Sequence, residues 1–451
     1  MSDAMDELSA LLEDDSREDR PVPCARLIGC AGTGKSYTLN TRTNADSHYG
    51  LLTATTGIAS VNLGGGARTL NSALGFFDTA SMRDCYLGGQ MVRRLHPIAL
   101  NYRWLIVEEY SMLVAEQLSI LHRAVAEANR YRDVESPLGI LLVGDLAQLP
   151  PVKGAWCFDS DVWPEFASHT ERLDKVWRQN GGPFLDALNH IRAGRGRAAV
   201  DILLGAGARF HTQVHTEFDG TTILPKNAMV NRYNMLALDR LPGPKVTVTA
   251  RRWGKLRPEW GENKMTHEWG IPPSREYKVG ALVMILANRP DFSVVNGDCG
   301  HIVAYEKSGD DGECFHVEMI RTGKVEVITK TVRPVEEYDE PEGFSGPKIS
   351  ADEDECEYIA EPHYRRKTRK YVVGQVEYFA LNLAYASTVH KSQSLTLDRV
   401  QADFRDSFFG EKAMMYVALS RCRTLEGLRL VGSPERFIER VNIDRRILPW
   451  L

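Results

Sequence analysis

The sequence contains one stretch whose residue types and spacing are suited to holding a phosphate chain. Residues 29–36 read GCAGTGKS and fit the phosphate-loop pattern G-x-x-x-x-G-K-[ST]. Glycines let such a backbone curl, so that successive N–H groups point at one anion at the positive end of a helix. Lys35 would then reach the β- and γ-phosphates of a nucleoside triphosphate, and the Ser36 hydroxyl would hold Mg²⁺.

The residues on either side of this loop favour that interpretation over a chance glycine-rich turn. An apolar run, Ala25–Ile28, precedes the loop, and Tyr37–Asn40 can open a helix. A strand, a loop and a helix in this order are the context that gives the pattern its meaning. The predicted nucleotide-binding residues are Gly29, Cys30, Ala31, Gly32, Thr33, Gly34, Lys35, Ser36 and Tyr37.

A pair of glutamates follows a second apolar run. Trp104–Val107 suits a buried strand, and Glu108 and Glu109 come directly after it. A carboxylate at a strand end beside a phosphate loop can hold Mg²⁺, and its neighbour can orient or deprotonate an attacking water. The alternative, two solvated surface acids, is hard to reconcile with the four apolar residues before them.

Further polar side chains follow other apolar stretches. Gly139–Val143 is an apolar run, and Asp145 and Gln148 come just after it, where a glutamine can sense a γ-phosphate. Arg178 lies in an apolar setting that either a structural salt bridge or a γ-phosphate contact would explain. Arg421 stands near the end of an apolar, helix-like stretch.

Most of these candidates follow short apolar runs, which indicates strands that place them along one edge of a sheet. Leu51–Ala54 is a further run of this kind, and Thr56 and Gly57 follow it. In open α/β sheets, ligands bind at the carboxyl ends of the strands. The sequence therefore predicts an α/β protein with one nucleotide-binding face.

Composition limits the class of protein. The chain has 451 residues, 43% hydrophobic and 25% charged, which predicts several packed units rather than disorder. It contains no apolar run of about 18 residues, so no membrane span is expected. Its 8 cysteines form no C-x-x-C pair. The acidic residues 1–20 lack the apolar core of a signal peptide, so we expect a reducing cytosol.

Nucleic acid would have to bind locally, because the net charge of −5 gives the whole chain no attraction for a polyanion. Residues 251–257 and 363–370 interleave basic and aromatic side chains. This pattern suits single-stranded nucleic acid, and a solvated β surface explains either cluster alone nearly as well. Both clusters lie in 241–375, where short strand-like runs and many turns predict a β-rich unit.

The motifs, taken in order, resemble those of superfamily 1 DNA helicases of the RecD/Pif-like group. The matching strings are GCAGTGKS, TATTGIAS, IVEEYSM, GDLAQLPPV, WRQ, NGDCG, HKSQSLT and YVALSR. They span nearly the whole chain, which is similar in size to the phage Dda helicase, and HKSQ followed by YVALSR is the most specific part. Glu108 stands where the group usually has aspartate. The group's adenine-reading glutamine motif is not recognisable in residues 1–24.

This resemblance implies an α/β fold with two RecA-like parallel-sheet core domains. A small insertion is expected in the first domain, at about residues 65–100, and an SH3-like β insertion in the second. The expected division is an acidic lead-in at 1–23, a first core domain at 24–175, a second core domain at 176–240 and 376–451, and the β insertion at 241–375 with an acidic loop at about 336–361.

The resemblance also implies roles for single residues, with ATP as the nucleotide and Mg²⁺ as the cofactor. Ser36 and Glu108 would hold the metal ion, and Glu109 would activate water. The catalytic set it implies is Lys35, Glu108, Glu109, Gln148, Arg178 and Arg421, with the two arginines reaching the γ-phosphate from the second core domain. The residues implied to line a single-stranded DNA track are Thr56, Gly57, Thr69, His390, Lys391 and Ser394.

The activity implied is that of an ATP-dependent DNA helicase that moves 5′-to-3′ on single-stranded DNA and unwinds forked duplex. It would act as a monomer in the cytoplasm of a bacterium or a phage-infected cell. Phe76 or Phe77 could serve as a wedge at the fork. One alternative is a translocase that acts on RNA or displaces proteins without unwinding. A second, less favoured alternative is a phosphate-loop kinase or nucleotide-gated switch, since that kind of protein would not be expected to contain the YVALSR motif.

Overall fold

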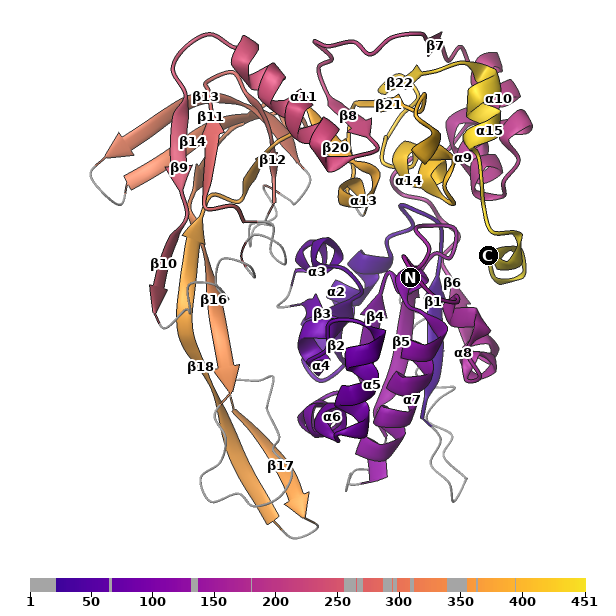
Figure 1. Cartoon of the computed structure of the whole chain (residues 1–451), viewed down its shortest axis with the longest axis vertical. Helices are drawn as coiled ribbons and strands as arrows, with labels where there is room; N and C mark the ends of the chain where they lie inside the picture. The colour runs from indigo at the N-terminus through magenta and orange to yellow at the C-terminus, as the bar shows by residue number, and fades with distance from the viewer. Residues whose placement is uncertain are drawn as a thin grey trace.

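The protein consists of two α/β domains, one above the other, with a β-rich third region beside the upper one (Figure 1). The structure is a computed structural model. It describes residues 22–451 except 65–66, 131–136, 180, 255–264, 266–270, 287–293, 295–297, 309–311, 339–354, 362–363 and 394. Ser394, one of the predicted DNA-track residues, lies outside the described residues.

The first domain is built on a parallel six-stranded sheet in the order β3-β2-β4-β5-β1-β6. Four of its strands are buried along their whole length, which explains why they read as near-continuous apolar runs. The strands are β1 (Cys24–Ile28), β2 (Gly50–Ala54), β3 (Arg68–Thr69), β4 (Trp104–Glu108), β5 (Gly139–Gly144) and β6 (Thr170–Arg172).

Helices complete the first domain. The segment at 65–100, expected to be a small insertion of weak periodicity, contributes the edge strand β3 and then three helices. Asp78 caps the second of these with a capping box to Ser81. The helices of this domain are α2 (Lys35–Ala45), α3 (Gly57–Leu63), α4 (Leu70–Leu74), α5 (Thr79–Leu87), α6 (Gln90–Asn101), α7 (Ala115–Arg130) and α8 (Trp163–Ser168).

The second domain has a parallel five-stranded sheet in the order β20-β8-β21-β22-β7. Its strands are β7 (Phe210–His211), β8 (Thr221–Leu224), β20 (Ala386–Thr388), β21 (Val400–Asp403) and β22 (Leu428–Val431). Its helices are α9 (Pro183–Arg192), α10 (Gly196–Gly205), α11 (Asn227–Arg240), α13 (Val389–Ser392), α14 (Met414–Leu419) and α15 (Pro434–Arg440). Two parallel sheets in one α/β chain fit the predicted pair of RecA-like core domains.

The third region leaves the second domain after α11 and returns to it at β20. Its main sheet is antiparallel, in the order β15-β14-β13-β12-β19, and packs around Tyr277, Phe315 and Phe379. The strands of this region are β9 (Val246–Thr249), β10 (Arg251–Gly254), β11 (Ser274–Tyr277), β12 (Leu282–Ile285), β13 (Cys299–Ser308), β14 (Gly312–Met319), β15 (Val325–Thr329), β16 (Thr331–Tyr338), β17 (Glu355–Glu361), β18 (Tyr364–Tyr378) and β19 (Leu381–Leu383).

Two boundaries differ from those read in the sequence. The insertion continues past residue 375, because β18 runs to Tyr378 and β19 pairs with β12. The acidic segment is not a loop at its ends, since β16 reaches Tyr338 and β17 pairs with β18, which together form a long ribbon beside the first domain (Figure 1). Residues 339–354, its middle, lie outside the described residues.

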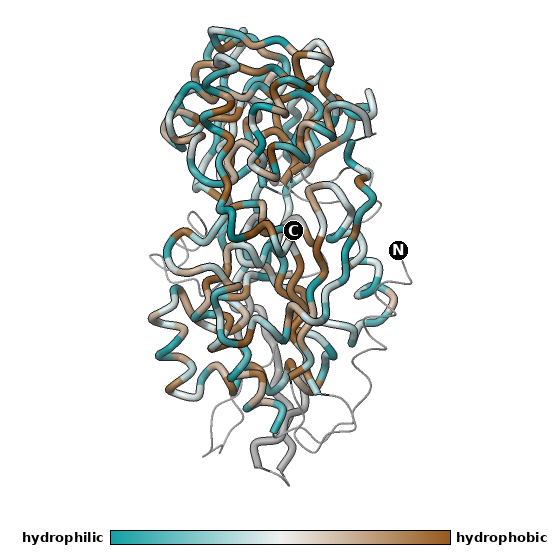
Figure 2. Tube along the Cα trace, turned by 90° about the vertical axis from the view of Figure 1, so that its right-hand side faces the viewer, coloured by the Kyte–Doolittle hydropathy of each residue, from teal (hydrophilic) through white to brown (hydrophobic). Residues whose placement is uncertain are grey.

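The two core domains share an interior. One cluster of buried apolar residues includes Leu146 and Trp156 of the first domain and Phe404 and Met415 of the second. In Figure 2, brown hydrophobic segments run through the middle of the trace. Among the described residues, no helix is both long and apolar enough to cross a membrane.

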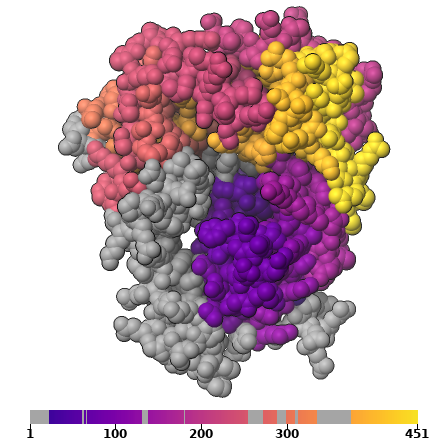
Figure 3. Space-filling view, viewed as in Figure 1, coloured from indigo at the N-terminus to yellow at the C-terminus, as the bar shows by residue number. Residues whose placement is uncertain are grey.

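The chain crosses back to the first domain after α15. We call this the η5 contact; it comprises Asp444–Leu451, including the 3-10 helix η5 (Arg445–Trp450). The Trp156 indole N–H donates to Asp444 Oδ2 at 3.0 Å. The Trp450 ring packs edge-on against Trp163, with 5.6 Å between centroids. Figure 3 shows these yellow C-terminal residues lying against the first domain.

Candidate active site between the two core domains

Residues 29–36, which we call the phosphate-type loop, connect the end of β1 to the start of α2, as the pattern predicts. Gly32 and Gly34 both have φ of 85°, a left-handed conformation that residues with a Cβ rarely adopt. At Gly29 a Cβ would lie 2.6 Å from Thr33 Oγ1. Only glycine fits at these three positions, so the loop keeps the curled backbone that can surround a phosphate.

Lys35 is buried at the base of this loop. Its Nζ donates to the carbonyl oxygens of Gly29, at 2.7 Å, and Cys30, at 3.1 Å. Burial lowers the pKa of Lys35, and the nearby Asp145 and Glu109 carboxylates oppose that effect. The Lys35 amine is therefore held against the loop backbone, near the carboxylates of Asp145 and Glu109.

The two predicted acids lie at the carboxyl end of β4. The Ser36 hydroxyl donates a short hydrogen bond to Glu108 Oε1. Burial, and secondly the Glu109 charge, raise the pKa of Glu108 to about 8. A hydroxyl and a carboxylate in contact, with a second carboxylate beside them, are the oxygen donors that Mg²⁺ prefers. The donor set fits that ion, and Ser36 and Glu108 are the residues that would hold it.

Glu109 has an uncommon backbone conformation for a residue with a side chain. Its φ is 55°, and its side chain is buried at the strand end. The segment after β2 fixes this turn, because Thr55 Oγ1 donates to Glu109 O at 2.9 Å and Thr55 N–H donates to Glu108 O at 3.1 Å. Hydrogen bonds thus join the carboxyl ends of β2 and β4, two of the strands that the sequence predicted to precede functional residues.

Gln148 is placed after β5, as the apolar run predicted. It is only 3% exposed, and its side-chain Oε1 has no hydrogen-bond partner among the described residues. A buried amide oxygen without a partner costs free energy unless a ligand or water completes it. Gln148 is therefore available to a bound molecule.

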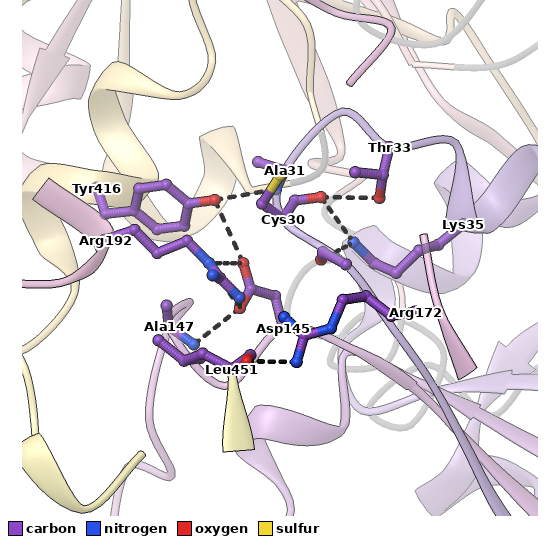
Figure 4. Close-up of polar contacts among 11 residues, drawn as sticks. Cys30, Ala31, Thr33, Lys35, Asp145, Ala147, Arg172, Arg192, Tyr416 and Leu451 are labelled. Carbon is purple, nitrogen blue, oxygen red and sulfur yellow. Dashed lines mark hydrogen bonds and ion pairs between the residues drawn. The ribbon is translucent and has the colours of Figure 1, made fainter. Parts of the chain in front are cut away.

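Asp145, which also follows β5, is bonded to two residues of the second domain. Arg192 of α9 donates to both of its carboxylate oxygens, at 2.8 and 3.1 Å (Figure 4). Tyr416 of α14 donates to Asp145 Oδ2 at 3.3 Å and accepts from the Ala31 N–H at 2.9 Å. Burial would raise the pKa of Asp145, and the Arg192 charge outweighs it, so the pKa is lowered. This contact joins the second domain to the phosphate-type loop.

Sequence reasoning missed Arg192 and Tyr416. Tyr416 is the first letter of YVALSR, which offered a signal, although nothing there pointed to the loop. Arg192 lies in no motif. Arg192 meets Asp145 only because α9 packs beside the end of β5 in the folded chain.

Arg178 lies directly over the loop. A Cβ added to Gly32 would lie 2.5 Å from Arg178 Cβ, and the Trp177 N–H donates to Gly32 O at 2.8 Å. The guanidinium donates to Thr396 Oγ1 at 2.9 Å and Ser420 O at 3.1 Å. A hydroxyl and a carbonyl therefore hold it, rather than the carboxylate that a structural salt bridge would require.

Arg421 is nearby and almost fully buried, with 1% of its surface exposed. It donates to Val417 O at 2.8 Å and Ser420 Oγ at 2.8 Å. Burial, and secondly the Arg421 charge, lower the pKa of Arg178 to about 9, and burial also lowers that of Arg421. Neither guanidinium forms an ion pair with a residue that the structure describes, and the Glu109 carboxylate acts on both only from beyond ion-pair distance.

The predicted DNA-track residues fall into two groups. In the first domain, Thr56 accepts from the Ala59 N–H at the start of α3, where Gly57 is the first helical residue, and Thr69 caps α4. In the second domain, His390 and Lys391 are exposed on α13. In Figure 1, α13 lies at the bottom of the second domain and α3 at the top of the first, on either side of the seam between them.

The two phenylalanines considered as a wedge differ sharply. Phe76 is 3% exposed and belongs to the core, whereas Phe77 is 91% exposed. A wedge must reach DNA, so only Phe77 can have that role.

Comparisons with known proteins give a consistent result. Residues 22–213 match the model of a family described as AAA domain. The chain is 30% identical over 432 residues to ATP-dependent DNA helicase Pif1 of Bdellovibrio bacteriovorus, covering 94% of this chain and 86% of that protein. It is also 30% identical over 424 residues to human ATP-dependent DNA helicase PIF1, covering 90% of this chain and 58% of the human protein.

Solved structures support the fold. The crystal structure of Bacteroides sp Pif1 in complex with ADP-AlF4 superposes with a TM-score of 0.70 at 23% identity, covering 99% of this chain and 97% of that one. The crystal structure of Pif1 helicase from Candida albicans gives a TM-score of 0.67 at 22% identity, covering 100% and 98%. These matches extend over nearly the whole chain and support the fold with two core domains.

Proposed function

The chain belongs to the Pif1 family of ATP-dependent DNA helicases, and from that premise we propose that it moves along single-stranded DNA, 5′-to-3′, and unwinds forked duplex by hydrolysing ATP between its two core domains. Membership of the family is the basis for proposing ATP-dependent unwinding of DNA. The residues between the two core domains support the mechanism of ATP hydrolysis described below.

One observation carries the proposal. Two buried guanidinium groups, Arg178 and Arg421, lie beside the phosphate-type loop without an ion pair among the described residues. Buried charges without a counter-charge are costly, so an anion that binds there gains a large stabilisation. The γ-phosphate of ATP, held by Lys35 and the loop N–H groups, is an anion of the required charge and place.

The arrangement supports hydrolysis at this junction. Glu109 would orient a water molecule, whose oxygen attacks the γ-phosphorus as the bond to the β–γ bridging oxygen breaks, giving ADP and phosphate. The water proton passes to the Glu109 carboxylate. Arg178 and Arg421 would stabilise the charge that develops on the γ-phosphoryl oxygens. When bound at Ser36 and Glu108, Mg²⁺ would neutralise part of the phosphate charge.

Movement along DNA would follow from the way in which bound ATP joins the two core domains. ATP would bridge the loop in the first domain to two arginines associated with the second, which favours a closed arrangement, and loss of the γ-phosphate would remove that bridge. Thr56 and Thr69 on one domain and His390 and Lys391 on the other would grip the DNA backbone. If the two domains hold alternately, each cycle moves the protein along the strand.

The first experiment measures ATP hydrolysis with single-stranded DNA, RNA, blunt duplex and no nucleic acid, with Lys35→Ala as the inactive control. We expect strong stimulation by single-stranded DNA alone. Hydrolysis that no nucleic acid stimulates would overturn the motor proposal, and preference for RNA would select the RNA translocase. Duplexes with a 5′ or a 3′ tail then test direction, since only the 5′-tailed substrate should be unwound.

Phe77 offers a test of strand separation itself. Phe77→Ala should reduce unwinding of forked duplex several-fold and leave DNA-stimulated ATP hydrolysis unchanged, because an exposed ring at the fork acts on the duplex and not on the nucleotide. Leu87→Ala, at another exposed apolar residue of the same segment, is the matched control. Equal loss of both activities in Phe77→Ala would rule out the wedge.

A further inference from the structure

A thiol, an imidazole and a carboxylate meet on the outer face of the insertion's main sheet. Cys314 and His316 are two residues apart on β14, so their side chains leave the strand on the same face. Phe315, between them, is 1% exposed and packs in the core of the insertion, which fixes that face as the outer one. Glu306 of β13 is the direct register partner of Cys314.

The distances are those of ligands around one ion. Cys314 Sγ lies 3.8 Å from His316 Nε2, and His316 Nε2 lies 3.2 Å from Glu306 Oε1. All three ligand atoms lie within 4.8 Å of one another. Tetrahedral zinc, with bonds of about 2.3 Å to sulfur and about 2.0–2.1 Å to nitrogen or oxygen, separates its ligand atoms by roughly 3.3–3.6 Å. Small side-chain rotations would suffice to admit the ion.

We propose that Glu306, Cys314 and His316 form a zinc site, with the fourth coordination position open to water. The donor set selects the metal, because thiolate and imidazole prefer Zn²⁺ to Mg²⁺ or Ca²⁺. Two anionic ligands balance the charge of the ion. The binding step releases the Cys314 thiol proton to solvent and involves no oxidation or reduction. The site lies in the insertion, and it does not depend on the function proposed above.

The neighbouring charges leave these three side chains available. Glu313, which precedes Cys314, is already paired with Lys307 at 3.3 Å and Lys330 at 3.0 Å. Without a metal, His316 Nε2 lies 3.2 Å from Glu306 Oε1 across the two strands, and Glu306 is largely exposed. A bound ion would replace this weak contact with bonds from both strands, and would hold β13 and β14 together.

A second cluster in the first domain has the same residue types and serves as a comparison. Cys24, His122 and Glu165 also lie within 4.8 Å of one another. Cys24 is the first residue of β1 and is buried, however, and burial raises its pKa, so the thiolate that a metal needs is disfavoured there. The cluster in the insertion is therefore the better site.

The test is a titration of the metal-free full chain with Co²⁺, whose thiolate bond gives a charge-transfer absorption, followed by displacement with Zn²⁺. We expect one equivalent to bind, an absorption that Zn²⁺ removes, and no competition from excess Mg²⁺. Cys314→Ser and His316→Ala should each abolish the absorption. Cys299→Ser, at a cysteine of the same sheet outside the cluster, and Cys24→Ser should keep it.

Two results would overturn the zinc site. One is the absence of any thiolate–cobalt absorption in the unchanged protein. The other is an absorption that survives Cys314→Ser and disappears in Cys24→Ser. Circular dichroism and DNA-stimulated ATP hydrolysis should match the parent in each variant, which separates loss of the metal from loss of the fold. If Cys314→Ser folds poorly, His316→Gln removes one ligand at nearly constant volume and decides the question.

Discussion

Two of the contacts between the second domain and the first differ in kind. At the phosphate-type loop, Arg192 pairs with Asp145, and the Tyr416 hydroxyl accepts from the Ala31 N–H. At the η5 contact, Trp450 packs on Trp163. The first place is charged, buried and made partly by the backbone that would hold phosphate. The second combines aromatic packing with ion pairs such as that of Arg446 with Asp159, and includes none of the residues predicted to bind ATP.

This difference suggests that the two contacts respond differently to nucleotide binding. A phosphate that needs the Ala31 N–H must displace Tyr416, so the contact at the loop is expected to change with the nucleotide. The η5 contact has no such competitor and should persist through the cycle. We therefore expect the domains to move about the η5 contact while the contact at the loop opens and closes.

The largest effect is expected from the two buried arginines that form no ion pair among the described residues. Arg421→Ala should reduce ATP hydrolysis by about 10³-fold or more, as removal of an arginine finger does. Steady-state hydrolysis with saturating single-stranded DNA measures this. Arg423→Ala is the matched control, because that arginine pairs with Asp398 and should retain most activity. Similar losses in both variants would mean that the charge acts only on the fold.

The charged part of the loop contact should give the largest effect on stability. Arg192→Ala leaves the Asp145 carboxylate buried without its partner, which costs about 3–5 kcal/mol. Chemical denaturation without nucleotide measures this loss. Arg192→Met combined with Asp145→Leu should recover most of it, since the uncompensated charge is then gone. A double variant as unstable as Arg192→Ala would show that packing, and not charge, holds this contact.

The η5 contact should give a smaller effect that nucleotide does not alter. Trp450→Ala removes an edge-to-face ring pair worth about 0.5–1.5 kcal/mol beyond its buried area. Melting with and without a non-hydrolysable ATP analogue should show equal shifts. Arg123→Ala is the control, since its ion pair with Asp161 lies outside the η5 contact, is more than half exposed on both sides and should contribute little. A shift that appears only without nucleotide would contradict a permanent pivot.

Tyr416→Phe is the mildest and the most discriminating change. It removes one hydroxyl shared by the Ala31 N–H and Asp145, at a cost of about 0.5–1.5 kcal/mol. The loss should appear in the nucleotide-free protein and disappear with nucleotide bound, while nucleotide affinity stays the same or rises. Equilibrium binding of a fluorescent ATP analogue, together with melting, measures both. Weaker nucleotide binding would mean that Tyr416 helps to hold the loop open for ATP.

The parts that sequence predicted well are those encoded locally. The loop after β1 and the acids after β4 follow from a glycine pattern and a short apolar run, and each is placed by its own strand. The Asp145–Arg192 pair depends on how α9 packs against β5, which no local pattern encodes. The sequence also could not distinguish Phe77 from Phe76, because the weak hydrophobic periodicity of this segment does not show which of the two rings faces the core.

The order of strands in the second sheet has a consequence for how the chain folds during synthesis. β8 lies between β20 and β21, and the whole insertion separates it from both in sequence. The first domain has all its strands within residues 24–172 and can fold as soon as they emerge from the ribosome. β8 must wait, with both edges unpaired, until the insertion has been made. Exposed strand edges promote association between chains, so this interval is where misfolding and aggregation should begin.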